Sequence, residues 1–334
     1  MDSGNNHGDN KVVFKSVLFN VLEDGRVVLR FPGATGKKIP PSDDPVTGVK
    51  MKDIRISSDV SARVFLPRGE SGYTKLPLLL YIHGGGFCME SAFSVVYTRY
   101  VSNLAAQANV IVVSVEYSLY SPCRPLPACY EESWAALEWV ASHDKGCGLE
   151  PWINNHADLQ RIFVGGDSAG GNICHTLLAC AGRSLSSRQR PLPESVRVEG
   201  MILAHPYFGI GGRDEEMWLY MCPTNEGPND RRLKPTLEDL ATIRCERVLV
   251  LVAENDPMNV AGKRYVEDLI KSGWKGTVEI VENTKKNHCF HLYNLEDQEA
   301  IANMRRITSF IHSSHYIKVK GSNKNPNLHL YSSL

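Results

Sequence analysis

The stretch GGDSAGGN (residues 165–172) follows the apolar run RIFV (161–164) and precedes a segment with helical spacing. Residues 166–170 within it fit the pattern G-x-S-x-G, which places a serine on a sharp turn between a buried strand and a helix. Glycine is needed on both sides of Ser168 because larger residues would clash in so tight a turn. The turn also puts Ser168 at the positive end of the helix dipole. A glycine-rich phosphate-binding or packing turn is the alternative from these residues alone.

The segments around this stretch alternate between two hydrophobic patterns. Continuous apolar runs rich in β-branched residues are typical of strands buried on both faces of a sheet, and they occur at 77–83, 110–117, 161–166, 198–208, 247–256 and 277–283. Helical spacing is found at 94–108, 129–143, 169–182, 263–273 and 298–313. Residues 53–67 alternate like antiparallel strands. Strands that alternate with helices predict an α/β fold, with a mainly parallel central sheet and helices on both faces.

The domain organisation follows from where this alternation begins and ends. We expect one large domain over residues 12–315, preceded by a disordered lead at 1–11. Residues 12–50 contain Pro40, Pro41 and Pro45 among mixed apolar and charged residues, and we expect them to form an N-terminal arm that contributes to a cap. Residues 209–235 interrupt the rhythm between two strands and are a candidate cap or pocket wall. The polar residues 316–334 are expected to be a disordered tail.

Composition narrows the class of partner and the compartment. The 37 Lys and Arg residues balance the 37 Asp and Glu residues, which argues against nucleic acid or an anionic membrane as a partner. Nine scattered cysteines without metal-site spacing favour a reducing compartment. The polar start shows no signal peptide, so we expect a cytoplasmic protein, with a peroxisomal address in the final Ser-Ser-Leu as a weak alternative.

A second glycine cluster, His83-Gly84-Gly85-Gly86-Phe87, comes directly after the apolar run PLLLYI (77–82). Three successive glycines bring backbone N–H groups close to one point, which is what the oxyanion of an acyl-transfer intermediate requires. A flexible turn is the alternative interpretation. A turn behind a buried strand seldom needs three glycines, so the pattern favours an oxyanion-binding loop.

A serine nucleophile needs a base and a carboxylate that holds the base in place. On a sheet of this kind the partners follow in the order serine, acid, histidine, from loops after successive strands. The loop after RVLVLVAEN (247–255) offers Asp256, with Glu254 as a nearby competitor. The loop after the strand at 277–283 offers His288, with His291 three residues on. We favour Asp256 because it lies past the strand, where its side chain can reach across.

Six short pieces of the sequence together carry a resemblance to a known family. They are HGGGF (83–87), GDSAGGN (166–172), HPYF (205–208), VAEND (252–256), KSGWKGTVEIVEN (271–283) and HCFHL (288–292). With them the chain resembles the hormone-sensitive-lipase branch of the α/β-hydrolases, and within it the plant carboxylesterases, over roughly Val12 to Ser313. The stretches EEMWLYMCPTN (215–225) and RLKP (232–235) are similar to plant esterases that include the tuliposide-converting enzymes.

The resemblance implies a role for each matching residue. Ser168 is implied as the nucleophile, Asp256 as the acid and His288 as the base. The implied oxyanion donors are the N–H groups of Gly84 or Gly85, of Gly86 and of Ala169. The chain departs from the family in residues 117–123, YSLYSPC, where many relatives read YRLAPEH. It also departs in the residues that follow the aspartate, where Pro257-Met258-Asn259 stands.

The sequence therefore predicts a serine carboxylesterase acting on a small or medium hydrophobic ester, without metal or cofactor, as a monomer or homodimer. Phe87, Tyr207, Phe208 and Trp218 are candidate substrate contacts, although each is equally suited to the core. A non-hydrolytic lyase, cyclase or intramolecular transacylase on the same scaffold is the alternative. A hormone receptor of this fold is disfavoured because the receptors lack the base histidine, which His288 supplies here.

Overall fold

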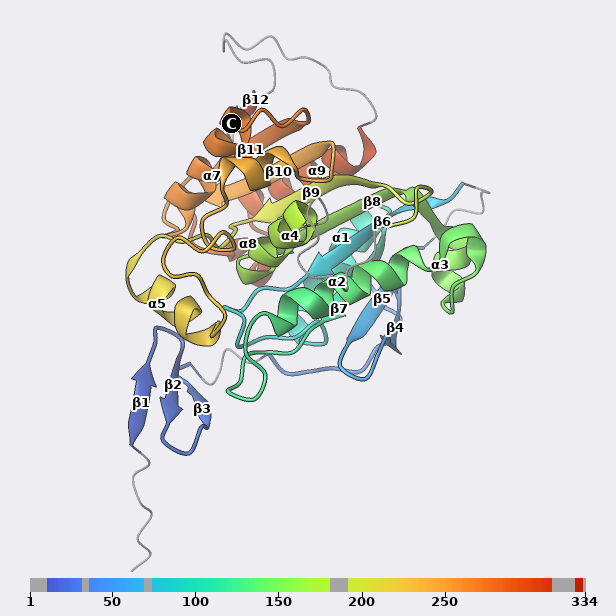
Figure 1. Ribbon diagram of the computed structural model, residues 1–334. Coiled ribbons are helices and arrows are strands. Elements are labelled where there is room, and N and C mark those ends of the chain that lie inside the picture. Colours follow the sequence, from blue (N-terminus) through green and yellow to red (C-terminus); the bar gives the residue numbers. More distant parts are fainter. Residues whose placement is uncertain (1–10, 32–35, 69–73, 181–191, 314–327, 333–334) are drawn as a thin grey trace, which may run out of the picture.

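The structure is a computed structural model that describes residues 11–31, 36–68, 74–180, 192–313 and 328–332. The predicted disordered lead at 1–11 lies outside these residues except for Lys11. Figure 1 shows a central twisted sheet flanked by helices, with a small second sheet near the N-terminal end of the described chain.

Within the described residues, the main sheet has nine strands in the order β12-β11-β10-β9-β8-β6-β7-β5-β4. Each pair of neighbours from β12 to β7 is parallel, whereas β5 pairs antiparallel with β7, and β4 with β5. The strands are β4 (Lys50–Arg55), β5 (Ser61–Leu66), β6 (Leu76–Ile82), β7 (Ile111–Glu116), β8 (Ala157–Asp167), β9 (Val198–Ala204), β10 (Arg247–Ala253), β11 (Thr277–Asn283) and β12 (Leu328–Ser332). The predicted mainly parallel sheet is confirmed.

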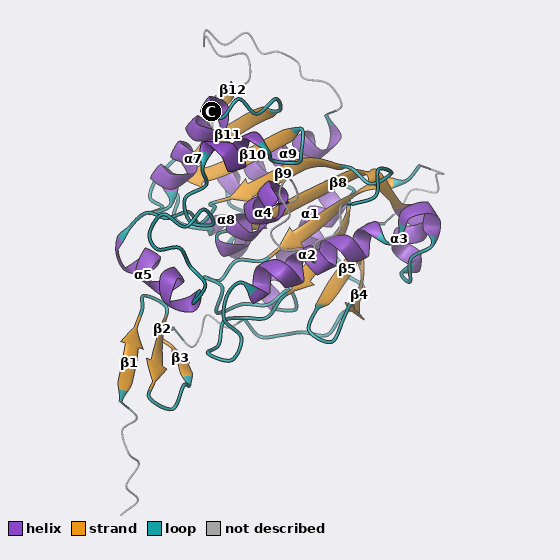
Figure 2. Ribbon diagram, viewed as in Figure 1, coloured by secondary structure: helices purple, strands orange, loops and turns teal. Residues whose placement is uncertain are grey.

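Helices cover both faces of this sheet, as predicted (Figure 2). The helices are α1 (Val95–Gln107), α2 (Ala128–Ala141), α3 (Pro151–His156), α4 (Ala169–Cys180), α5 (Gly212–Met221), α6 (Leu237–Ala241), α7 (Asn259–Lys271), α8 (Phe290–Tyr293) and α9 (Gln298–His312), with a 3₁₀ turn at Asp144–Gly146. Helices α2, α4 and α7 contribute to one buried cluster, and α1 and α9 contribute to the other.

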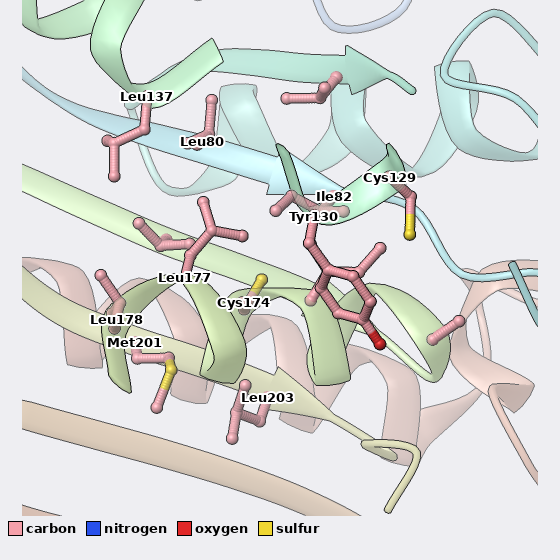
Figure 3. Close-up of a cluster of buried hydrophobic side chains, with 14 of the residues drawn as sticks. Leu80, Ile82, Cys129, Tyr130, Leu137, Cys174, Leu177, Leu178, Met201 and Leu203 are labelled. Carbon is pink, nitrogen blue, oxygen red and sulfur yellow. The ribbon is translucent and has the colours of Figure 1, made fainter. Parts of the chain in front are cut away.

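The central strand β6 divides its side chains between these two cores. Leu78, Leu80 and Ile82 belong to the cluster under α2, α4 and α7, whereas Leu79 and Tyr81 belong to the cluster under α1 and α9. Successive strand residues point to opposite faces, so an uninterrupted apolar run is what a sheet with two covered faces requires. Figure 3 shows the first cluster, where side chains of α2 and α4 meet those of β6 and β9.

The first part of the N-terminal arm forms a small sheet of its own. Strands β1 (Val12–Lys15), β2 (Phe19–Leu22) and β3 (Val27–Leu29) pair antiparallel in that order. The sheet docks beside α5, where the ring of Phe14 stacks on that of Tyr220 with centroids 3.6 Å apart. The turn between β1 and β2 places Leu18 against the glycine loop at residues 84–86, because a Cβ on Gly86 would lie 2.2 Å from Leu18 Cδ1.

The predicted disordered tail is wrong for residues Leu328–Ser332. These five residues form β12, which adds to the edge of the main sheet in parallel pairing with β11. Residues 316–327 and 333–334 of the predicted tail lie outside the described residues. No helix among the described residues is long and apolar enough to cross a membrane.

Candidate active site

The turn at Ser168 joins β8 directly to α4, as G-x-S-x-G predicts. Ser168 has φ 51°, a left-handed backbone that is uncommon outside glycine. Its N–H donates to the carbonyl of Ala204 at 2.9 Å, and its own carbonyl accepts from the N–H of Tyr207 at 2.9 Å. Two bonds to the end of the neighbouring strand therefore hold the serine in this conformation.

Both glycines of the turn face the same carbonyl oxygen. A Cβ on Gly166 would lie 2.3 Å from the oxygen of Ile82, and a Cβ on Gly170 would lie 2.0 Å from it. Contacts this short do not occur, so the close approach of the helix to β6 requires glycine at both positions.

We expect Gly170→Ala to cost roughly 3 kcal/mol or more in the free energy of unfolding, because the new methyl group meets backbone that cannot move away. Gly171→Ala is the matched control, since its Cβ would lie 3.1 and 3.2 Å from Pro206 Cβ and Cα and 3.5 Å from the Gly166 oxygen, none of them as close as the Ile82 oxygen is to a Cβ on Gly170. Urea unfolding of both variants measures the difference. Equal stability of Gly170→Ala and wild type would contradict the packing described for this turn.

Ser168, His288 and Asp256 form one chain of hydrogen bonds. His288 Nε2 lies 2.9 Å from Ser168 Oγ, and His288 Nδ1 lies 2.7 Å from Asp256 Oδ2. An ionised carboxylate only accepts, so the proton of the neutral ring is on Nδ1, and Nε2 is free to accept from the serine hydroxyl. The three side chains come from the loops after β8, β10 and β11, and the structure brings them together as the sequence predicts.

The Asp256 side chain is almost fully buried and ionised. Burial opposes ionisation, but hydrogen bonds from His205 and His288 outweigh it and hold the pKa of Asp256 below its usual range. The N–H of Met258 donates to the second carboxylate oxygen, Oδ1, at 2.8 Å. The bond from His205 Nδ1 to Oδ2, at 3.1 Å, was not expected from the sequence.

The two competing residues from the same loops do not join this chain. Glu254 is exposed and accepts from the N–H of Lys285 at 2.7 Å. His291 is buried, and neither ring nitrogen has a hydrogen-bond partner among the described residues. The preference for Asp256 and His288 over these two therefore agrees with the geometry.

The glycine loop after β6 lies against the serine turn, since a Cβ on Gly84 would be 3.1 Å from Ser168 Cβ. The N–H of Gly84 already donates to Tyr97 Oη at 2.9 Å, so Gly84 is not free to bind an oxyanion. Gly85 and Gly86 have φ 101° and 57°. No described residue accepts a hydrogen bond from the N–H of Gly85, Gly86 or Ala169, and these three remain the candidate donors.

Comparison with known proteins agrees with this geometry. The profile of the alpha/beta hydrolase fold matches residues 79–292, which contain the glycine loop, the serine turn, Asp256 and His288. The chain belongs to the α/β-hydrolase family. Its curated relatives place it with the plant carboxylesterases of the hormone-sensitive-lipase type.

Three plant relatives resemble this α/β-hydrolase over most of its length. A 2-hydroxyisoflavanone dehydratase of Glycyrrhiza echinata is 39% identical, covering 88% of this chain and 94% of the relative. Probable carboxylesterase 1 of Arabidopsis thaliana is 36% identical, covering 91% and 98%. Tabersonine synthase of Catharanthus roseus is 38% identical, covering 87% and 95%. Among solved structures, an esterase of Pyrobaculum calidifontis superimposes with a TM-score of 0.63 at 25% identity, covering 78% of this chain and 84% of that one.

A buried network links the glycine loop of this hydrolase to its serine turn. Tyr97 Oη accepts from the N–H of Gly84 and donates to Asp167 Oδ2 at 2.8 Å. Tyr81 Oη donates to the other oxygen of the same carboxylate at 2.7 Å. Asp167 precedes Ser168, so one tyrosine hydroxyl connects the two loops that meet at the site.

We expect Tyr97→Phe to lower the free energy of unfolding by roughly 1–3 kcal/mol, because it leaves the buried Gly84 N–H without a partner and Asp167 Oδ2 with only the thiol of Cys289 as a donor. Tyr100→Phe is the control, since the Tyr100 hydroxyl on the same helix makes no hydrogen bond to a described residue. Chemical denaturation measures both variants. If the two substitutions lowered the free energy of unfolding equally, the hydrogen bonds of Tyr97 would not contribute to stability as described.

The four residues proposed as substrate contacts lie in the hydrophobic core, each at most 4% exposed. Trp218 Nε1 donates to Tyr130 Oη at 3.2 Å, and Phe208 stacks on Tyr265 with centroids 4.7 Å apart. Phe87 and Tyr207 meet edge to face at 5.7 Å. These contacts account for Trp218 and Phe208 as core residues, and a substrate contact by Phe87 or Tyr207 stays a prediction.

Among the described residues, His205, Asp256 and His288 form the one group close enough in geometry to hold a metal ion, with ligand atoms within 4.8 Å. The atoms that would bind it are the two Nδ1 atoms and the carboxylate that they face. Each Nδ1 carries a proton that it donates to Asp256 in a hydrogen bond. A metal ion bound by these nitrogens would have to displace both protons. The geometry therefore fits proton transfer better than metal binding.

Proposed function

We propose that this α/β-hydrolase is a serine carboxylesterase that hydrolyses a small or medium hydrophobic ester through an acyl-enzyme. The observation that carries the proposal is the unbroken chain Ser168–His288–Asp256, with bonds of 2.9 and 2.7 Å. The side chain of His288 is 35% exposed, whereas that of Asp256 is 1% exposed. The base is thus open to substrate, while the acid that holds it is shielded from water.

The proposed reaction begins when Ser168 Oγ attacks the ester carbonyl and passes its proton to His288 Nε2. The tetrahedral oxyanion accepts hydrogen bonds from the N–H groups of Gly85, Gly86 and Ala169. As the C–O bond of the ester breaks, His288 gives the proton to the departing alcohol, which leaves an acyl group on Ser168. Asp256 stays ionised and stabilises the imidazolium in both half-reactions.

Water then completes the cycle with the same groups. His288 Nε2 removes a proton from water, whose oxygen attacks the acyl carbonyl. The second oxyanion that forms accepts hydrogen bonds from the same N–H groups as the first. Collapse of this intermediate breaks the bond to Ser168 Oγ, and His288 returns the proton to the serine. The products are one carboxylic acid and one alcohol, and no metal or cofactor takes part.

The test is turnover of short-chain p-nitrophenyl esters, with release of both p-nitrophenol and the free acid followed over time. We expect multiple turnovers by the wild type, with a burst of p-nitrophenol where deacylation is slower than acylation. Esters of increasing acyl length then define the substrate class. A folded wild-type protein with no activity on any activated ester would overturn the esterase assignment.

A non-hydrolytic reaction on the same groups is the second candidate. It is supported by the relatives named a dehydratase and a synthase, which are 39% and 38% identical to this chain. Incubation with extracts of the source tissue, analysed by mass spectrometry, separates the two functions. Addition of water to the substrate supports hydrolysis, whereas loss of water or an unchanged mass supports elimination or rearrangement.

The proposed reaction needs no partner other than a small-molecule ester. The nine scattered cysteines support a reducing, cytoplasmic compartment. We propose that the protein acts there as a monomer or homodimer, which light scattering of the purified protein tests.

A further inference from the structure

A second histidine reaches the carboxylate that holds the proposed catalytic base. His205 is the first residue after β9, the strand that lies between β8 and β10 in the sheet, and its side chain is completely buried. Its Nδ1 lies 3.1 Å from Asp256 Oδ2, the same oxygen that lies 2.7 Å from His288 Nδ1. Two histidines from different loops thus share one oxygen of one carboxylate.

The proton positions follow from the acceptor. The carboxylate of Asp256 is ionised and can only accept, so His205 must carry a proton on Nδ1. Burial lowers the pKa of His205, and the neutral ring therefore has a bare Nε2. No described residue bonds to that Nε2. His205 is thus a donor to Asp256 through one nitrogen, and its other nitrogen is buried without a partner.

Packing alone does not account for a histidine at this position. An unpaired buried ring nitrogen costs free energy that a hydrocarbon ring of similar size would not. The backbone of His205 has φ 50°, a left-handed conformation that costs a residue with a Cβ a further 1–3 kcal/mol or so. The ring also stacks on His291, another buried histidine without a hydrogen-bond partner, with centroids 5.2 Å apart. Such costs are tolerated where the one hydrogen bond of the His205 side chain, to Asp256, is needed.

We propose that His205 is a positioning residue, whose Nδ1–H fixes the Asp256 carboxylate so that Oδ2 faces His288 throughout the reaction. Three donors then define the carboxylate, with Met258 N–H on Oδ1 and the two histidines on Oδ2. The proposal rests on the proposed esterase function, because it assigns His205 a part in holding that reaction's base. His205 does not itself touch the substrate.

Two substitutions separate the N–H from the ring. His205→Asn keeps an N–H donor at the place of Nδ1 but removes the ring, and asparagine tolerates a left-handed backbone better than most residues. His205→Phe keeps a ring to stack on His291 but removes the donor. A positioning role predicts that the asparagine variant is the more active, whereas a packing role predicts the opposite order.

The experiment measures kcat and KM of wild type, His205→Asn and His205→Phe on one p-nitrophenyl ester, with Ser168→Ala as the inactive reference. We expect His205→Phe to lose about 10- to 100-fold in kcat, since a hydrogen bond to a charged group is lost. Its KM should stay within about twofold, because the substrate does not contact His205. His205→Asn should retain kcat within roughly threefold of wild type.

The outcomes distinguish this inference from the proposed function. An inactive wild type contradicts the esterase, whereas an active wild type with an equally active His205→Phe contradicts only the role of His205. Greater activity of His205→Phe than of His205→Asn, or loss of the folded protein in His205→Asn alone, would make the ring a packing element and overturn the proposal.

Discussion

Replacing Ser168 with alanine should lower kcat for ester hydrolysis by about 10⁵- to 10⁶-fold, with KM little changed. We propose that the hydroxyl oxygen forms the acyl bond, since His288 Nε2 lies 2.9 Å from it and can take its proton. Without it, the loop N–H groups and substrate binding can still stabilise direct attack by water, which leaves a small residual rate. Steady-state kinetics on a p-nitrophenyl ester measures the loss.

Ser133→Ala is the matched control for this prediction. Ser133 is a fully buried serine on α2, and its hydroxyl makes no hydrogen bond to a described residue. We expect its activity to stay within about twofold of wild type. If Ser168→Ala kept more than a tenth of the wild-type activity, the nucleophile would have to be another group.

Replacing His288 with alanine should cause a loss in kcat of similar size, about 10⁴- to 10⁶-fold, because a serine hydroxyl at neutral pH is a weak nucleophile without a base. The double variant with Ser168→Ala should be no worse than either single variant, since the two residues act as one unit. Added imidazole is expected to restore part of the activity of His288→Ala but none of that of Ser168→Ala.

The control for His288 is His312→Ala, an exposed histidine at the end of α9 that should leave kcat unchanged. If the losses in kcat of the two single variants multiplied in the double variant, Ser168 and His288 would act independently, which contradicts the proposed mechanism. Activity of His288→Ala near that of wild type would also remove His288 from the proposed mechanism.

Most of the fold could be predicted because a parallel sheet with two covered faces is visible as a pattern. Every run predicted as a buried strand became one, although the run 198–208 ends as strand at Ala204, where the left-handed backbone of His205 breaks it. Strand β12 was missed because its pairing depends on β11, a partner distant in the sequence, and not on a local pattern. The arm strands pair with their neighbours in the sequence, but each is only three or four residues long, too short for a clear alternating pattern.

The candidate site could be predicted as far as its residues, but not as far as their contacts. The order of Ser168, Asp256 and His288 after successive strands follows from topology, and their hydrogen bonds agree with it. The hydrogen bond from the Gly84 N–H to Tyr97 Oη depends on how α1 packs against the glycine loop, which no local pattern shows. His205 directly follows β9, which lies between the strands that lead to Ser168 and Asp256. This position was the signal in the sequence for its contact with Asp256.

The proposed mechanism forms a covalent bond between Ser168 and the acyl group of the substrate. The most direct measurement is to mix the wild type with p-nitrophenyl butyrate, quench in acid within the first turnovers, and map the acyl group by mass spectrometry of the digested protein. We expect a butyryl group on Ser168 of the wild type and no such group in Ser168→Ala. Continued turnover with no acyl group on Ser168, or with the group on another residue, would contradict it.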